Sequence, residues 1–138
     1  HRLEPWPDAV RGVERLAGRY TVATLSNGHV ALLSGMAKRA GLRWNVILSA
    51  ELFMQYKPDE AVYTGAAALL GLSPNEVMMV AAHADDLEAA RGAGLRTAYV
   101  HRPLEHGTGR VTHVPSGAGF DLYAADFGEL ASKLGAPL

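Results

Sequence analysis

Apolar side chains recur along the chain in two alternating patterns, one with the period of a helix and one typical of a buried strand. The helical spacing occupies four segments, residues 8–17, 30–40, 58–70 and 85–94. Between and after them lie four largely apolar runs, residues 20–25, 46–48, 77–80 and 96–100. Glycine, which commonly ends a helix, follows the first three helical segments at positions 18, 41 and 71. The chain therefore predicts helices that alternate with strands.

This alternation predicts the fold class. Strands separated by helices pair in parallel through right-handed crossovers. We therefore expect an α/β fold with a doubly wound parallel sheet, formed by a single domain over residues 1–138. Ser73-Pro74-Asn75-Glu76 has the form of a capping box and predicts one helical turn before the third strand. Glycines and prolines predict a long loop over residues 101–119, and residues 120–138 predict an edge strand and a closing helix.

The composition excludes several classes of protein. The 138 residues carry 13 basic and 14 acidic side chains, a net charge of -1, which is neither a nucleic-acid footprint nor a polybasic membrane patch. No apolar run approaches the ~20 residues of a membrane span. The absence of cysteine excludes disulfides, thiolate nucleophiles and cysteine metal sites. It also permits a reducing compartment, and we expect a cytoplasmic protein.

Three polar turns follow the predicted strands, at the edge where doubly wound sheets bind their ligands. These turns are Ser26-Asn27-Gly28, the segment around Lys57, and residues 82–86. Ser26, Asn27 and the backbone N–H groups beside them could bind an anion, or they could only cap the next helix. Lys57 could equally be a solvated surface lysine. Asp85 and Asp86 could equally be first-turn capping residues.

Taken together, the three turns resemble the haloacid dehalogenase superfamily, and within it the 2-haloacid dehalogenases with a helical cap. The resemblance rests on three stretches: Leu25-Ser26-Asn27-Gly28, Tyr56-Lys57-Pro58-Asp59 through Tyr63, and Val80-Ala81-Ala82-His83-Ala84-Asp85-Asp86. The later segment Arg102-Pro103-Leu104-Glu105-His106-Gly107 is similar to a subgroup that includes defluorinating members. The ordered set is more specific than any one of the motifs.

The resemblance implies hydrolytic dehalogenation of short 2-haloacids, fluorinated ones included. In the family an aspartate attacks the halogen-bearing carbon, and water then hydrolyses the resulting ester. Ser26 and Asn27 would hold the substrate carboxylate and help to form the halide pocket. Lys57 would pair with the nucleophile and keep it ionised. Tyr63 would orient this cluster, and Asp86 would position Lys57 or the hydrolytic water.

The family's nucleophilic aspartate and its helical cap have no counterpart in this sequence. No Asp-x-[Asp/Tyr]-Gly-Thr type motif precedes the Ser26 turn, so we expect the C-terminal core part of a longer enzyme, inactive by itself. In the family the strand that bears the nucleophile lies centrally, between the strands predicted at 20–25 and 77–80. We therefore expect these two strands not to pair directly, with the slot between them open or filled by another polypeptide.

Three residues at the end of the third strand depart from the family pattern. Family phosphatases carry Gly-Asp there to hold magnesium, whereas this chain has Ala81-Ala82. Alanine cannot ligate a hard cation, so we expect a metal-free reaction and no cofactor. Dehalogenases tend to have Ser and Asn where this chain has Ala81 and His83. His83 either takes over part of the water-positioning role as a neutral imidazole or is a polar loop histidine.

Two other functions stay open from the sequence. One is a phosphatase of the same superfamily, although the alanine at position 82 argues against it. The other is a truncated core without activity that acts at most as an assembly or binding unit. The expected partner is a small 2-halocarboxylate, with no nucleic acid and no membrane. A homodimer is allowed, although the sequence does not decide the oligomeric state.

Overall fold

The computed structural model describes residues 9–101 and 119–136 of the chain, which fall into two compact units. The first unit comprises His1–Lys57 and Phe127–Leu138, and the second comprises Pro58–Asp126. Each unit has its own sheet, with the strand order β1-β2 in the first and β3-β4-β5 in the second. All strand pairs are parallel, which confirms the predicted α/β class.

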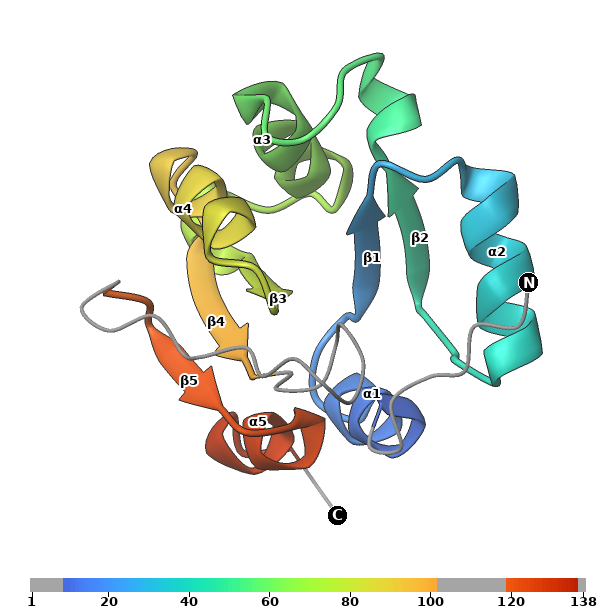
Figure 1. Ribbon diagram of the computed structural model, residues 1–138, viewed down its shortest axis with the longest axis vertical. Coiled ribbons are helices and arrows are strands. Elements are labelled where there is room, and N and C mark those ends of the chain that lie inside the picture. Colours follow the sequence, from blue (N-terminus) through green and yellow to red (C-terminus); the bar gives the residue numbers. More distant parts are fainter. Residues whose placement is uncertain (1–8, 102–118, 137–138) are drawn as a thin grey trace, which may run out of the picture. The chain divides into compact units, whose positions relative to one another are not determined.

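The sheet of the first unit is a βαβ arrangement. Strands β1 (Ala23–Ser26) and β2 (Val46–Ser49) run parallel, and helix α2 (Val30–Ala40) connects them. Figure 1 shows both strands pointing the same way, with α2 alongside β2. The register places Ser26 beside Ser49, so the segments that follow the two strands start at the same edge.

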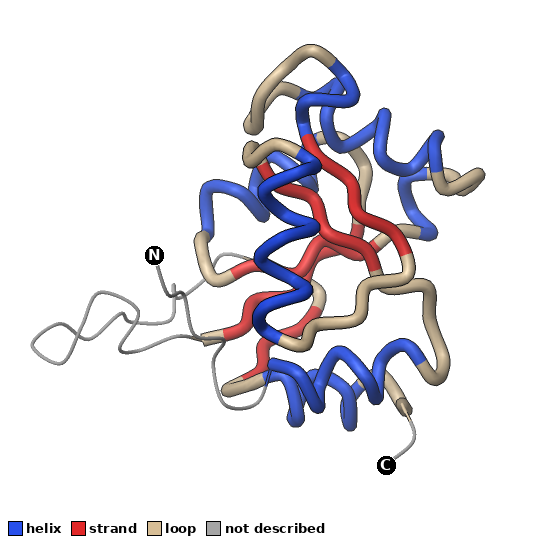
Figure 2. Tube along the Cα trace, turned by 90° about the vertical axis from the view of Figure 1, so that its right-hand side faces the viewer, coloured by secondary structure: helices blue, strands red, loops and turns tan. Residues whose placement is uncertain are grey.

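Helices α1 (Ala9–Ala17) and α5 (Phe127–Lys133) pack against each other in the first unit (Figures 1 and 2). Gly12 makes this close approach possible. A Cβ atom at that position would lie 2.4 Å from the Cβ of Phe127, nearer than real Cβ atoms come. A larger residue at Gly12 would therefore push the two helices apart.

The helical segments of the first unit agree only in part with those predicted from the sequence. Gly41 ends α2 as predicted, with a left-handed φ of 75° and its N–H donating to the carbonyl of Ala37. A short 3-10 helix, η1 (Ala50–Phe53), directly follows β2 and was not predicted. Ser49 is its N-cap, and the Ser49 side chain accepts a hydrogen bond from the N–H of Glu51 at 3.1 Å. A segment this short has no apolar period to detect.

The second unit is built around β4, which pairs with a strand on either side. Its elements in chain order are α3 (Glu60–Leu69), η2 (Pro74–Glu76), β3 (Met78–Ala81), α4 (Ala84–Gly92), β4 (Arg96–Val100) and β5 (Leu122–Ala124). Every residue of β4 after Arg96 is buried, whereas β5 lies at the edge of the sheet. The capping box is also present, because the Glu76 carboxylate accepts the Ser73 N–H at 2.9 Å.

Helix α4 packs on this sheet through an apolar cluster. Leu87 of α4 is fully buried together with Tyr99 of β4, and Phe120 completes the cluster. This packing fixes the start of α4, where Asp85 and Asp86 occupy the first turn as predicted.

Strands β1 and β3 belong to different sheets. Within the described residues β1 pairs with β2 and β3 pairs with β4, each inside its own unit. The loop predicted over residues 101–119 lies outside the described residues except at its two ends. None of the helices in the described part of the chain is long and apolar enough to cross a membrane.

Candidate functional site

The turn that follows β1 is closed by its own serine. The Ser26 Oγ accepts a hydrogen bond from the N–H of Gly28 at 3.1 Å. The N-cap of α2 is His29, and its side chain makes no capping hydrogen bond. The alternative that Ser26 or Asn27 caps this helix is therefore wrong. Ser26 is half-buried and Asn27 is exposed.

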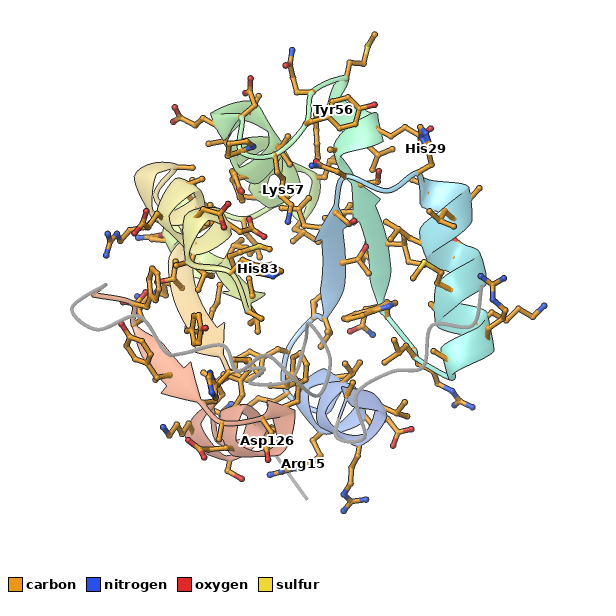
Figure 3. All side chains as sticks on the ribbon, in the orientation of Figure 1. Arg15, His29, Tyr56, Lys57, His83 and Asp126 are labelled. Atoms are coloured by element: carbon orange, nitrogen blue, oxygen red, sulfur yellow. The ribbon has the colours of Figure 1, made fainter. Side chains whose placement is uncertain are left out.

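Asn27 holds the backbone of Lys57 at two points. Its Oδ1 accepts the Lys57 N–H at 2.7 Å, and its Nδ2 donates to the Lys57 carbonyl at 3.5 Å. The first bond is short and the second is at the outer limit for a hydrogen bond. Figure 3 shows Lys57 in the loop that follows η1. The two bonds therefore fix where the Lys57 side chain leaves the backbone, beside the turn after β1.

Two residues that the sequence reasoning missed, Ser49 and Glu51, fasten the same turn from the end of β2. The Ser49 side chain is fully buried, and its Oγ donates to the carbonyl of Gly28. Glu51 Oε1 accepts the N–H of Val30 at 2.9 Å, and Oε2 lies 3.0 Å from His29 Nδ1. In the sequence these two residues appear only as a serine and a glutamate at the end of a strand. Their hydrogen-bond partners, Gly28 and Val30, each lie 21 residues earlier in the chain.

The position of Glu51 also has an electrostatic consequence. The hydrogen bond from the Val30 N–H and then the one from His29 lower the pKa of Glu51 below its ordinary value of 4.5. Val30 is the first residue of α2, and a carboxylate is stabilised at a helix N-terminus. Glu51 thus caps a helix to which it does not belong.

In the second unit, Tyr63 of α3 and Asp86 of α4 share a short hydrogen bond. The Tyr63 hydroxyl donates to Asp86 Oδ1 at 2.6 Å. Tyr63 is fully buried, and this burial, followed by the bond to Asp86, raises the Tyr63 pKa well above its ordinary value of 10.0. The phenol therefore stays protonated and remains a donor at neutral pH.

The segment between β3 and α4 contains the positions that depart from the family pattern. His83 is the exposed N-cap of α4, labelled in Figure 3, and its side chain makes no capping hydrogen bond. Ala81 ends β3, and Ala82 follows it with only a methyl side chain. Across residues 9–101 and 119–136, no three His, Cys, Asp or Glu side chains form a group that could hold a metal ion.

The predicted site residues are divided equally between the two units. The first unit contains Ser26, Asn27 and Lys57. The second contains Tyr63, His83 and Asp86. Hydrogen bonds join Asn27 with Lys57 and Tyr63 with Asp86. The first group offers a hydroxyl, an amide and an ammonium, which suit a carboxylate or another anion. The second offers a carboxylate oriented by a phenol, which suits a water molecule or a cation.

Comparison with known proteins gives a consistent result. Residues 1–94 match the family model described as haloacid dehalogenase-like hydrolase. The (S)-2-haloacid dehalogenase 4A of Burkholderia cepacia is 38% identical over 103 residues, which are 72% of this chain and 45% of that protein. The (S)-2-haloacid dehalogenase of Pseudomonas sp. (strain YL) is 34% identical over 106 residues, again 45% of its length. The chain thus spans about half the length of these curated relatives.

Solved structures agree with the sequence relatives. An L-2-haloacid dehalogenase superposes with a TM-score of 0.92 at 48% identity, over 97% of this chain and 59% of the other. A defluorinating L-2-haloacid dehalogenase also gives 0.92, at 45% identity over 97% of this chain and 55% of the other.

Proposed function

The chain belongs to the haloacid dehalogenase-like hydrolase family, and on this premise we propose that the full-length protein hydrolyses short 2-haloacids to 2-hydroxy acids and halide. The main structural support for the proposal is the pair of hydrogen bonds between the Asn27 side chain and the Lys57 backbone. They fix a lysine beside the turn after β1, where the resemblance places the reacting groups. The names of the relatives support the substrate class.

The proposed reaction has two steps. A carboxylate oxygen of an aspartate outside these 138 residues attacks C2 of the substrate. The carbon–halogen bond breaks, the halide leaves with the bonding electron pair, and an ester forms. Water then attacks the ester carbonyl, which restores the aspartate and releases the 2-hydroxy acid and one proton.

In this proposal the first unit binds substrate and keeps the nucleophile charged. The Lys57 ammonium lowers the pKa of a carboxylate placed near it, so the nucleophile is ionised at neutral pH. Ser26 accepts a hydrogen bond from Gly28, and its own O–H donates to the substrate carboxylate. Asn27 already uses its amide oxygen and one N–H on Lys57, so it serves the substrate with its second N–H.

The second unit supplies the groups for ester hydrolysis. Asp86 accepts the Tyr63 hydroxyl on Oδ1, and in this proposal its carboxylate positions the hydrolytic water. His83, at the N-cap of α4, accepts the proton of that water.

We further propose that the reaction needs no metal ion. Ala82 has no side-chain oxygen to offer where family phosphatases place a magnesium-binding carboxylate, and magnesium requires oxygen donors. The same methyl group disfavours the phosphatase alternative. A homodimer and a cytoplasmic location belong to the same proposal, and gel filtration and cell fractionation of the full-length protein test them.

Halide release tests the proposed function. The full-length protein is incubated with 2-chloropropionate and with fluoroacetate, and free chloride or fluoride is measured. We expect chloride release, and the defluorinating relative supports fluoride release as well. Hydrolysis of a phosphate monoester with added magnesium, without halide release, would favour the phosphatase. Release of neither product by the full-length protein would refute both enzyme functions, and halide release by the full-length protein but not by these 138 residues alone would identify the chain as an inactive core.

A further inference from the structure

Ser49 and Glu51 connect the end of β2 to the turn after β1 by three side-chain contacts. Ser49 Oγ donates to the Gly28 carbonyl, and Glu51 contacts the Val30 N–H and His29 Nδ1. We propose that Ser49 and Glu51 are positioning residues, which hold this turn so that it can bind the substrate carboxylate. The inference rests on the proposed function and names two residues to which no role has been assigned so far.

The two residues act as one unit, which we call the Ser49–Glu51 clamp. The Ser49 hydroxyl that donates to Gly28 also accepts the N–H of Glu51 at 3.1 Å. Ser49 is fully buried, so a lost hydrogen bond there cannot be replaced by bulk water. The clamp thereby holds the turn on both sides of His29, at the carbonyl of Gly28 and at the N–H of Val30.

The origin of the capping oxygen distinguishes positioning from ordinary helix capping. A serine, aspartate or asparagine at the N-cap would satisfy α2 from within its own sequence. Here the N-cap residue His29 makes no such bond, and the carboxylate comes from the segment after the neighbouring strand. The cap therefore fixes α2 and its preceding turn relative to β2, which a local cap does not do.

The held turn carries the proposed substrate contacts. Ser26 and Asn27 lie directly before Gly28, and Asn27 in turn holds the Lys57 backbone. A shift of Gly28 would therefore displace the Ser26 hydroxyl directly. It would displace Lys57 only indirectly, through Asn27. Loss of the clamp should consequently weaken substrate binding more than it slows the chemical step.

The experiment compares three variants of the full-length protein with wild type. Glu51→Ala removes both contacts of the carboxylate, whereas Glu51→Gln keeps an oxygen that can accept the Val30 N–H. Glu129→Ala is the matched control. It breaks a Lys133–Glu129 ion pair of the same 3.0 Å length and similar exposure, on α5 of the same unit.

Steady-state halide release gives KM and kcat for each variant. We expect Glu51→Ala to raise KM about tenfold, which corresponds to about 1.4 kcal/mol, with a smaller change in kcat. Glu51→Gln should recover most of that loss, and Glu129→Ala should match wild type. Equal KM values for Glu51→Ala and Glu129→Ala would overturn the inference.

Amide hydrogen exchange provides a readout that does not depend on activity. The amides of Gly28 and Lys57 bond to Ser26 and Asn27, not to Glu51. If the clamp positions the turn, both amides exchange faster in Glu51→Ala. Faster exchange confined to Val30 and the first turn of α2 would show simple capping and overturn the inference. Failure of the wild-type protein to release halide would instead refute the proposed function, and the exchange result would still decide the role of the clamp.

Discussion

Replacing Asn27 with alanine tests how the candidate site is held together. The variant loses the 2.7 Å bond from the Lys57 N–H and the 3.5 Å bond to the Lys57 carbonyl. Both hydrogen bonds are exposed, so water can partly replace Asn27 as the partner of the Lys57 N–H and carbonyl. Since the longer bond contributes little, we expect a stability loss of about 1 kcal/mol, close to the net value of one hydrogen bond.

The effect on turnover should be larger than the effect on stability. Without the two bonds, the Lys57 backbone is no longer tied to the turn after β1. A displacement of a charged group by about 1 Å can reduce the rate roughly a hundredfold, so we expect kcat to fall at least about tenfold.

Asn45→Ala is the matched control for this variant. The Asn45 Oδ1 accepts the Val22 N–H at 2.7 Å, the same length as the bond from Asn27, but just before β1 starts. Denaturant unfolding and halide release are measured for both variants in the full-length protein. Both should lose similar stability, and only Asn27→Ala should lose turnover. Equal kcat values for the two variants would refute the role of Asn27 in holding Lys57.

Four further outcomes follow from the same structure. Gly12→Ala should cost about 1–3 kcal/mol in denaturant unfolding because the new Cβ meets Phe127, whereas Gly92→Ala, with no atom within 4 Å, should be neutral or stabilising. Lys57→Met should abolish halide release with unchanged unfolding, and turnover within about tenfold of wild type would contradict its assignment. Hydrogen bonds lower the pKa of Glu51, so wild type should be more stable than Glu51→Gln at neutral pH. This advantage in unfolding free energy should vanish as pH falls below 4.5, and an advantage that persists in acid would contradict the assignment. EDTA should leave halide release unchanged, and a loss restored by magnesium would count against a metal-free reaction.

Local patterns in the sequence predict most of the secondary structure. Gly41 in the left-handed region and the Ser73–Glu76 capping box are determined by neighbouring residues, and both occur where predicted. The strands that sequence patterning places at 46–48 and 96–100 are also present, and Leu48 in the first and the residues after Arg96 in the second are buried. The parallel pairing follows from the helices between them.

Contacts between distant residues could not be predicted in the same way. Asn27 bonds to a residue 30 positions away, and a surface lysine and a held lysine look alike in sequence. Glu51 lies in a four-residue 3-10 helix and caps a helix that starts 21 residues earlier. Its role depends on the pairing of β1 with β2, which places the ends of the two strands side by side. The hydrogen bond between Tyr63 and Asp86 joins residues 23 positions apart and was not predicted from the sequence either.

A single-turnover experiment in water enriched in oxygen-18 tests the central claim most directly. The full-length protein, in excess over 2-chloropropionate, completes one turnover, and mass spectrometry locates the heavy isotope. In the proposed reaction the new hydroxyl oxygen comes from the aspartate, so the first product carries ordinary oxygen and the heavy isotope enters the protein. A first product that carries oxygen-18, with an unlabelled protein, would show direct attack of water on C2 and contradict the account.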